Sequence, residues 1–172
     1  MRLIRWMIFI IAIFIFFFVL GLLLPSKVTV SKSVLINATT EKVSNQLVNF
    51  GQWKNWYPGF REGNVSVSKG SLESETRKSV TIEDKQGRII RFNIIDIKPG
   101  SVEVEVRSSS STKVGYQFIF TTKMNRQTQL TWNINADLGW YPWKRIRGIF
   151  LEKFSGAQYE AALSDLKKAA EN

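Results

Sequence analysis

The side chains that most often carry out catalysis are missing from this chain. Its 172 residues include no histidine and no cysteine, which removes the commonest general base, the commonest metal ligand and every thiolate. Serine–histidine–aspartate and cysteine–histidine sites are therefore excluded, and the sequence contains neither a P-loop nor a dinucleotide-binding glycine motif. We accordingly expect no metal ion and no cofactor.

Carboxylates and tyrosines remain as candidates for acid–base chemistry. Such chemistry requires a group whose pKa is shifted by burial or by a close partner. Glu103, Glu105 and Asp137 fall on the polar positions of alternating segments, so we expect them in solvent. The alternation around Asp96 is interrupted, which suggests a bulge near Ile94. Asp96 and Tyr116 are therefore the acid–base candidates that the sequence retains.

Apolar side chains form a second group of candidate functional residues. Alternation in the segments 88–97, 102–107, 114–121 and 130–137 predicts strands with one apolar face. These residues either fill a core or surround a cavity for a hydrophobic ligand. The predicted lining is Ile90, Phe92, Ile94, Val104, Tyr116, Phe118, Phe120, Trp132 and Ile134, with Phe150, Phe154, Tyr159 and Leu163 from the C-terminal segment. Because a buried tyrosine or tryptophan needs a polar partner, Tyr116, Trp132 and Tyr159 are expected to orient the polar end of a ligand.

The first 24 residues differ from the rest of the chain. Nineteen residues from Trp6 to Leu24 carry no charge, and as a helix they would be about 28 Å long, close to the thickness of a bilayer core. A cleaved signal peptide has a shorter apolar region and a small-residue cleavage site, which Leu22–Pro25 does not provide. We therefore expect an uncleaved transmembrane helix over residues 1–24 and a folded domain over residues 25–172. Arg2 and Arg5 favour a cytoplasmic N-terminus, which places the domain of this single-pass protein outside the cytoplasm.

The elements of the folded domain follow from the periodicity. A first strand alternates from Val28 to Ile36, and Thr39 or Thr40 then caps a helix. Two short helices, six strands and a long helix over about residues 143–170 follow, with a kink expected at Ser155–Gly156. Short connections between the strands are typical of an antiparallel meander, and a curved meander of this length is best covered by the last helix.

Three motifs resemble the START-like (SRPBCC) superfamily, and in particular its bacterial polyketide cyclase/dehydrase-type members with one N-terminal membrane helix. The motifs are Val28-x-Val30-x-Lys32-Ser33-Val34-x-Ile36-Asn37-Ala38-x-x-Glu41-Lys42-Val43, Trp53-x-x-Trp56-x-Pro58 and Gly156-x-x-Tyr159-x-x-x-Leu163-x-x-Leu166-Lys167. The resemblance implies an α+β helix-grip fold, in which a seven-stranded antiparallel sheet wraps around a long C-terminal helix. It also implies an apolar cavity for lipids, sterols, polyketides or similar molecules, without a shared catalytic set. The chain departs from the family in its serines and threonines after Thr39 and in its polar segment 72–83.

The net charge of the chain is +10, and without Arg2 and Arg5 the remainder carries +8. A basic surface suits nucleic acid or anionic lipid. Because a membrane helix precedes the domain, we expect a membrane partner and no nucleic acid. The basic turns at Lys69, Lys98 and Lys123–Arg126 are predicted to lie at the end of the sheet next to the membrane helix and to face the bilayer.

A second aromatic and basic segment spans residues 139–147. It contains Trp140, Tyr141 and Trp143 beside Lys144, Arg145 and Arg147, a composition that suits a lipid interface or a loop packed on the last helix. If the basic turns lie next to the membrane helix, this segment lies at the opposite end of the sheet, near the mouth of the cavity.

The sequence thus predicts a membrane-anchored domain that binds a hydrophobic small molecule or lipid in an internal cavity. Two alternatives remain open: a cofactor-free polyketide cyclase or hydrolase that uses Asp96 or Tyr116, and a tethered protein-interaction domain with a filled core.

Overall fold

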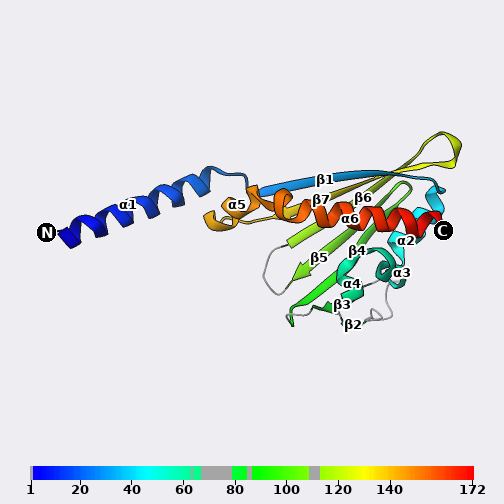
Figure 1. Ribbon diagram of the computed structural model, residues 1–172, viewed down its shortest axis with the longest axis horizontal. Coiled ribbons are helices and arrows are strands. Elements are labelled where there is room, and N and C mark those ends of the chain that lie inside the picture. Colours follow the sequence, from blue (N-terminus) through cyan, green and yellow to red (C-terminus); the bar gives the residue numbers. More distant parts are fainter. Residues whose placement is uncertain (1, 63, 67–78, 85–86, 109–112) are drawn as a thin grey trace.

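The structure, a computed structural model, describes residues 2–62, 64–66, 79–84, 87–108 and 113–172 (Figure 1). The helices are α1 (Arg2–Leu23), α2 (Thr40–Val48), α3 (Phe50–Trp56), α4 (Pro58–Glu62), a 3₁₀ turn η1 (Met124–Arg126), α5 (Pro142–Ile149) and α6 (Leu151–Glu171). The strands are β1 (Lys27–Ile36), β2 (Asn64–Ser66), β3 (Ser79–Glu83), β4 (Ile89–Lys98), β5 (Ser101–Ser108), β6 (Lys113–Thr122) and β7 (Thr128–Asp137).

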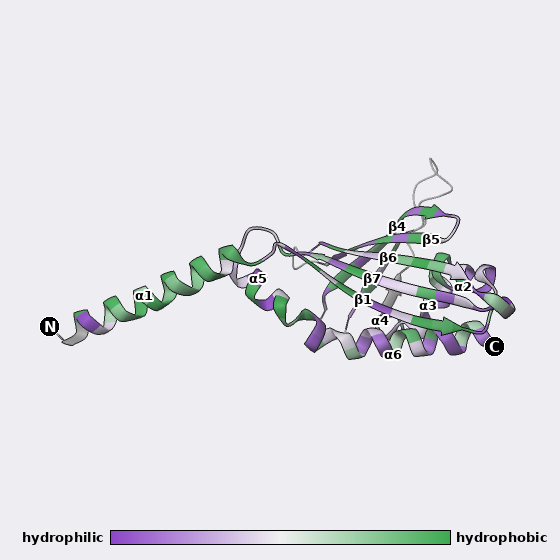
Figure 2. Ribbon diagram, turned by 90° about the horizontal axis from the view of Figure 1, so that it is seen from above, coloured by the Kyte–Doolittle hydropathy of each residue, from purple (hydrophilic) through white to green (hydrophobic). Residues whose placement is uncertain are grey.

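The seven strands form one antiparallel sheet in the order β1-β7-β6-β5-β4-β3-β2. The chain is therefore a meander from β2 to β7, and β1 pairs with the last strand. Helix α6 lies across one face of this sheet, as Figures 1 and 2 show from two directions. The predicted helix-grip architecture is confirmed.

Alternation along the strands explains which face of the sheet is buried. In β7, Leu130, Trp132 and Ile134 are fully buried, whereas the residues between them are half-exposed. Helix α6 contributes Leu163 and Leu166 to the same core. The pairing of β4 with β5 shifts register between Ile94 and Asp96, which confirms the predicted bulge.

The short helices cover one end of the core. Thr39 caps α2 by accepting a hydrogen bond from the backbone N of Lys42. The helix ends at Val48, because Asn49 leaves the helical conformation and its side chain caps α3 at the backbone N of Gly51. A third short helix, α4, follows.

The break in the C-terminal helical segment lies at Phe150, between α5 and α6, and the predicted kink at Ser155–Gly156 is wrong. Gly156 is buried inside a continuous helix. Lys32 of β1 lies beside it, and the ammonium group of this lysine pairs with Glu152 and Glu160. These ion pairs also explain a lysine on the inward face of β1.

Helix α1 extends away from the folded domain (Figure 1). Residues Ile4–Leu23 are long and apolar enough to cross a membrane, and only 6% of this span is buried. Figure 2 shows hydrophobic residues on all sides of the helix. The last turns of α1 contact α5.

The strand register contradicts the predicted position of the basic turns. Lys27, at the start of β1, pairs with Asp137, whereas Ile36 pairs with Thr128. The turn Lys123–Arg126 therefore lies at the end of the sheet away from α1. The turn after Lys98 lies at this far end too, because Gly100 accepts a hydrogen bond from the backbone N of Phe120.

The positions of Lys98, Lys123 and Arg126 next to the membrane were thus predicted wrongly, and Lys69 lies outside the described residues. The reason is that β1 begins next to α1 and runs away from it. Turns that lie beside the last residues of β1 are therefore at the end of the sheet farthest from α1. The segment from Trp140 to Arg147 follows the near end of β7, and it lies beside α1 instead of at the distal end.

Candidate functional site

Aromatic rings occupy the space between the sheet and α6. The cluster consists of Phe50, Trp53, Trp56, Tyr57 and Phe60 from the α3–α4 region, Phe92, Tyr116, Phe118 and Trp132 from the sheet, and Tyr159 from α6. The rings of Phe118 and Trp132 stack with their centroids 5.1 Å apart. This part of the interior is filled, so a ligand must bind beside the stacked pair or displace it.

The structure brings most of the predicted lining residues together. Nine of them are buried in the core: Phe92, Ile94, Val104, Tyr116, Phe118, Phe120, Trp132, Ile134 and Leu163. Ile90 and Tyr159 are half-buried and pack against this core.

Phe150 and Phe154 do not line the interior, and their predicted positions are wrong. Phe150 is 45% exposed and Phe154 is 75% exposed. Phe150 lies in the break between α5 and α6. Phe154 precedes Leu163 by nine residues, which is about two and a half helical turns, so the two side chains point to opposite sides of α6.

The aromatic residues of α3 and α4 were missed as site residues. Phe50, Trp53, Tyr57 and Phe60 recur every three or four positions, which is the spacing of one helical face, and Trp56 is next to Tyr57. Three of these rings lie within 5.7 Å of Phe92 by centroid distance. The helical spacing of these aromatic residues could therefore have identified them from the sequence.

Three tyrosines meet within the cluster. The hydroxyl oxygens of Tyr57 and Tyr116 are 3.0 Å apart and share a hydrogen bond. The rings of Tyr116 and Tyr159 pack edge-on, with their centroids 6.5 Å apart. The rings of both Tyr116 and Tyr159 pack edge-on against Trp132, at centroid distances of 5.0 and 5.1 Å. The three residues predicted to orient a ligand are thus in mutual contact.

Trp132 carries a buried donor without a partner. Its Nε1 makes no hydrogen bond to any residue that the structure describes. The other two indoles of the cluster are satisfied, since Trp53 donates to the carbonyl of Leu47 and Trp56 donates to the carbonyl of Gln46. Leaving a buried donor unpaired costs about 1–3 kcal/mol. A ligand with an acceptor group would recover this loss.

Burial controls the protonation of the tyrosines. It raises the pKa of Tyr57 to about 12, and it also raises the pKa values of Tyr116 and Tyr159. All three hydroxyls are therefore protonated at neutral pH. They can donate hydrogen bonds to a ligand, but they cannot act as bases in this state.

Asp96 lies outside this cluster. It pairs with Glu103 across the sheet, on the face opposite to the core, and its carboxylate forms an ion pair with Lys98 at 2.5 Å. The prediction of Asp96 as an acid–base residue of the interior is therefore wrong. Within the described ranges, no group of acidic side chains is arranged to hold a metal ion.

The interior is less completely covered at the end near α1. Along β4 burial falls from Phe92 to Ile90, and along β6 it falls from Tyr116 to Val114. Ile90 and Val114 face the core but are half-exposed, and both begin their strands at the α1 end of the sheet. Water therefore reaches the inward face of the sheet here, beside Tyr159.

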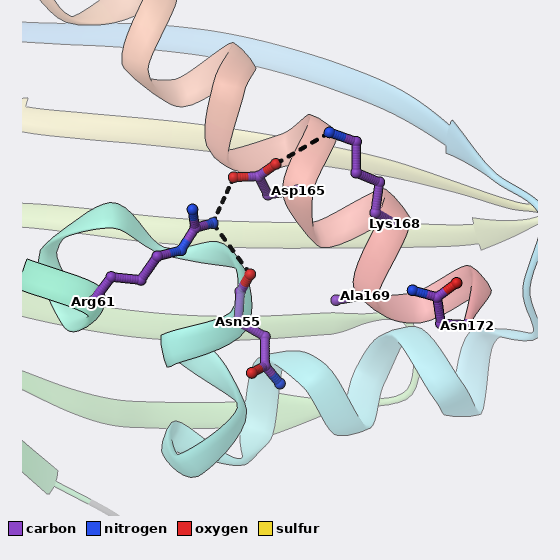
Figure 3. Close-up of a pocket in the computed structure, with 6 residues that line it drawn as sticks. All are labelled: Asn55, Arg61, Asp165, Lys168, Ala169 and Asn172. Atoms are coloured by element: carbon purple, nitrogen blue, oxygen red, sulfur yellow. Dashed lines mark hydrogen bonds and ion pairs between the residues drawn. The ribbon is translucent and has the colours of Figure 1, made fainter.

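A separate polar pocket of about 440 Å³ lies on the surface between α3, α4 and the end of α6 (Figure 3). Its lining residues are Asn55, Arg61, Asp165, Lys168, Ala169 and Asn172. Arg61 donates to Asp165 and to the backbone carbonyl of Asn55. The hydrogen bond from Arg61 to Asp165 lowers the pKa of the Asp165 carboxyl group. Since Arg61 and Asp165 neutralise each other, we interpret this pocket as a contact that joins α4 to α6.

Comparison with known proteins agrees with the fold. The family described as polyketide cyclase / dehydrase and lipid transport matches residues 27–171. The chain belongs to this family. No curated protein matches it.

Solved structures with the fold of this polyketide cyclase/dehydrase family member share little sequence with it. A START superfamily protein from Mycobacterium smegmatis has a TM-score of 0.64 at 16% identity, over 83% of this chain and 97% of that protein. The Zhui aromatase/cyclase from Streptomyces sp. R1128 has a TM-score of 0.63 at 13% identity, over 84% and 94%. The hypothetical protein jhp0584 from Helicobacter pylori has a TM-score of 0.60 at 14% identity, over 83% and 88%.

Proposed function

We propose that this member of the polyketide cyclase/dehydrase and lipid transport family is a membrane-tethered protein that binds a hydrophobic molecule with one polar acceptor, such as a carbonyl oxygen. The observation that carries the proposal is the unpartnered Nε1 of Trp132, whose ring packs against the rings of Tyr116 and Tyr159 in an apolar interior. A buried polar group with an unused hydrogen bond in apolar surroundings is typical of sites that orient a small ligand.

The half-exposed end of the interior is the proposed entrance. A ligand that enters past Ile90 and Val114 meets Tyr116 first and Trp132 next, because these residues follow one another along the paired strands β6 and β7. Burial of apolar ligand surface supplies the affinity, at about 25 cal/mol per Å², and the donors fix the orientation. Room for the ligand requires some rearrangement of the stacked rings of Phe118 and Trp132.

The proposed tether is α1. Its length, its apolar surface and its exposure suit a bilayer span, and Arg2 and Arg5 in its first turns favour a cytoplasmic N-terminus. We divide the chain into a transmembrane helix over residues 1–24 and a binding domain over residues 25–172, with the domain outside the cytoplasm.

Replacement of Trp132 by phenylalanine tests the binding site. Prodan, an apolar fluorophore with one ketone, is titrated into the detergent-solubilised full-length protein, and native mass spectrometry of the same sample looks for a co-purified lipid. Loss of one hydrogen bond, worth about 0.5–1.5 kcal/mol, should weaken prodan binding by roughly 2–13-fold. It should cost stability only through the volume that is lost, because the indole NH had no partner.

Trp53→Phe is the matched control, since it removes an indole NH that is already bonded to the carbonyl of Leu47. We expect this variant to lose more stability than Trp132→Phe, because it removes a similar volume and also a hydrogen bond, and to weaken prodan binding less. Failure of the wild-type protein to bind prodan or to carry any lipid would refute the proposed function. Equal affinity of both variants would refute the role of Trp132.

Catalysis of a cyclase type is a second candidate, which the hydrogen-bonded pair of Tyr57 and Tyr116 favours. At neutral pH the hydroxyl of Tyr116 is protonated, so it can donate a hydrogen bond to a ligand carbonyl and stabilise negative charge that develops on its oxygen. Conversion of a linear polyketone by the purified protein would distinguish this candidate from binding alone.

A further inference from the structure

The segment between β7 and α6 packs on the side of α1. We call residues 139–150 the foot; it comprises the loop after β7, helix α5 and Phe150. The ring of Trp143 lies 5.3 Å from that of Phe14 and 5.8 Å from that of Phe18, measured between centroids. Phe14, Phe18 and Gly21 lie on one face of α1, at the spacing i, i+4, i+7. A side chain at Gly21 would come within 2.5 Å of Cβ of Pro142, so the two helices approach closely here.

These contacts fix how deep the foot would lie if α1 spans a bilayer. Phe18 is five residues before the end of α1 and Phe14 is nine, which corresponds to about 8 Å and 14 Å along the helix axis. Half of the hydrocarbon core is about 15 Å thick. The ring of Trp143 is therefore beside a part of α1 that would lie within the leaflet next to the domain.

The outer surface of the foot has the composition of a membrane interface. Trp140 is 62% exposed and stacks on Tyr141, with the ring centroids 4.5 Å apart. The ammonium group of Lys144 lies 5.3 Å above the ring of Tyr141. Tryptophan and tyrosine are enriched where a protein crosses the boundary between lipid and water, and a lysine beside them can reach the phosphate layer.

Arg145 joins the foot to the end of α1. Its Nη1 donates to the carbonyls of Leu22 and Leu24 at 2.9 and 3.2 Å, and its Nε donates to the carbonyl of Gly139 at 3.0 Å. The last carbonyls of a helix have no partners within the helix. Because Arg145 supplies partners for them, the backbone at the end of α1 can lie at the edge of a bilayer without water, and the foot is held against it.

We propose that the foot is inserted into the lipid bilayer interface beside α1, with Trp140 and Tyr141 among the phospholipid headgroups. This proposal goes beyond the binding function and rests only on the proposed membrane span of α1. It turns the half-exposed end of the interior towards the lipid. The occupant of this surface is the membrane that already contains α1, because the apolar contacts of α1 continue without interruption into the foot.

Single-cysteine reporters test the proposal in the full-length protein, which has no cysteine of its own. Tyr141→Cys carries the polarity-sensitive fluorophore NBD in phosphatidylcholine nanodiscs, with or without brominated acyl chains as quenchers. Ile10→Cys reports on α1, and Met124→Cys is the control, since Met124 is 88% exposed at the far end of the sheet. We expect blue-shifted emission and quenching by brominated lipid at positions 10 and 141, and neither at position 124.

Each of the alternative results would contradict one specific proposal. Quenching at position 10 without quenching at position 141 would refute the inserted foot and leave the membrane helix in place. Blue-shifted emission at position 141 without quenching would assign the foot to a protein partner such as a second copy. A lack of quenching at both positions would refute the membrane helix itself, whereas the prodan measurement tests ligand binding separately.

A second pair of variants tests whether α1 positions the foot. Gly21→Leu should force Pro142 away from α1 and reduce quenching at position 141. Ala12→Leu makes the same change on the opposite, exposed face of α1, and it should leave the quenching unchanged. Equal quenching in the two variants would show that the contact with α1 does not set the depth of the foot.

Discussion

At the scale of single residues, the tyrosine hydroxyls are the polar groups around which the interior is arranged. Tyr57 and Tyr116 share one hydrogen bond, and the ring of Tyr159 packs against that of Tyr116. Burying a neutral, hydrogen-bonded phenol costs little free energy, but ionising it in an apolar environment costs much more. Alkaline pH therefore probes this cluster directly.

We expect the protein to lose stability as the pH rises above about 10. Tyr57 has a pKa of about 12 in the folded protein and of about 10 when unfolded, so the folded state binds the proton more tightly. Its contribution is complete below the unfolded pKa and is lost as the pH rises towards 12. The raised pKa values of Tyr116 and Tyr159 act in the same direction.

Urea unfolding at a series of pH values, followed by circular dichroism, measures this loss, and tyrosinate absorbance shows when the phenols ionise. Tyr57→Phe should flatten the decline between about pH 10 and pH 12. A stability that stays constant over this interval would show that the tyrosines are not buried as the structure has them.

The identities of several site residues could be predicted from the sequence. Tyr116, Trp132 and Tyr159 were assigned together because each combines an apolar ring with a polar group, and the structure places their rings in contact. Phe150 and Phe154 were misplaced because periodicity does not show where a helix breaks. The unpartnered state of the Trp132 donor is a property of packing, which no local pattern encodes.

At the scale of elements, glycines determine how closely α5 and α6 approach their neighbours. An added Cβ at Gly156 would lie no closer than 3.6 Å to surrounding atoms, which is an ordinary contact. An added Cβ at Gly148 would lie 2.2 Å from Cδ1 of Leu138 and 3.3 Å from Cγ2 of Val28. The two positions are both buried and helical, but only the second lacks space.

Alanine substitutions at these two glycines should therefore have opposite effects. Gly156→Ala should stabilise the domain by about 0.5–1 kcal/mol, because alanine loses less conformational entropy than glycine in a helix. Gly148→Ala should destabilise it by about 1–3 kcal/mol, since Leu138 must move out of a packed position. Urea unfolding of the two variants beside the wild type checks both signs. Equal effects would contradict the packing of α5 against β1.

Elements were predicted better than their relative positions. Alternation identified the seven strands, and its interruption identified the bulge after Ile94. The end of the sheet at which each turn lies was wrong for Lys98 and Lys123. It depends on the pairing of β1 with β7, a contact between residues about one hundred positions apart in the sequence, and a pattern within one strand does not contain this information.

At the scale of the whole molecule, α1 and the domain share a contact surface. Gly21 and Pro142 are buried against each other, and Arg145 bonds to the carbonyls of Leu22 and Leu24. The proposed boundary at residue 24 thus separates two units that touch. Removal of the first unit should expose the foot.

We expect a protein of residues 25–172 to fold and to self-associate. The core residues all lie after residue 25, so circular dichroism should show cooperative unfolding. Light scattering after size-exclusion chromatography should show association that increases with concentration, and Trp143→Ser should reduce it. A protein that does not fold would contradict the proposed boundary. A strictly monomeric one would contradict the apolar character of the surface that α1 covers.

Three residues, Leu24, Pro25 and Ser26, connect α1 to β1, and the carbonyl of Ser26 accepts a hydrogen bond from Leu138. A connection of three residues spans at most about 10 Å, so a domain held in this way has almost no radius of action. If α1 spans a bilayer as proposed, the domain stays at the membrane surface and moves only with the bilayer. A ligand of the kind proposed would then have to reach it through the membrane or from a mobile donor.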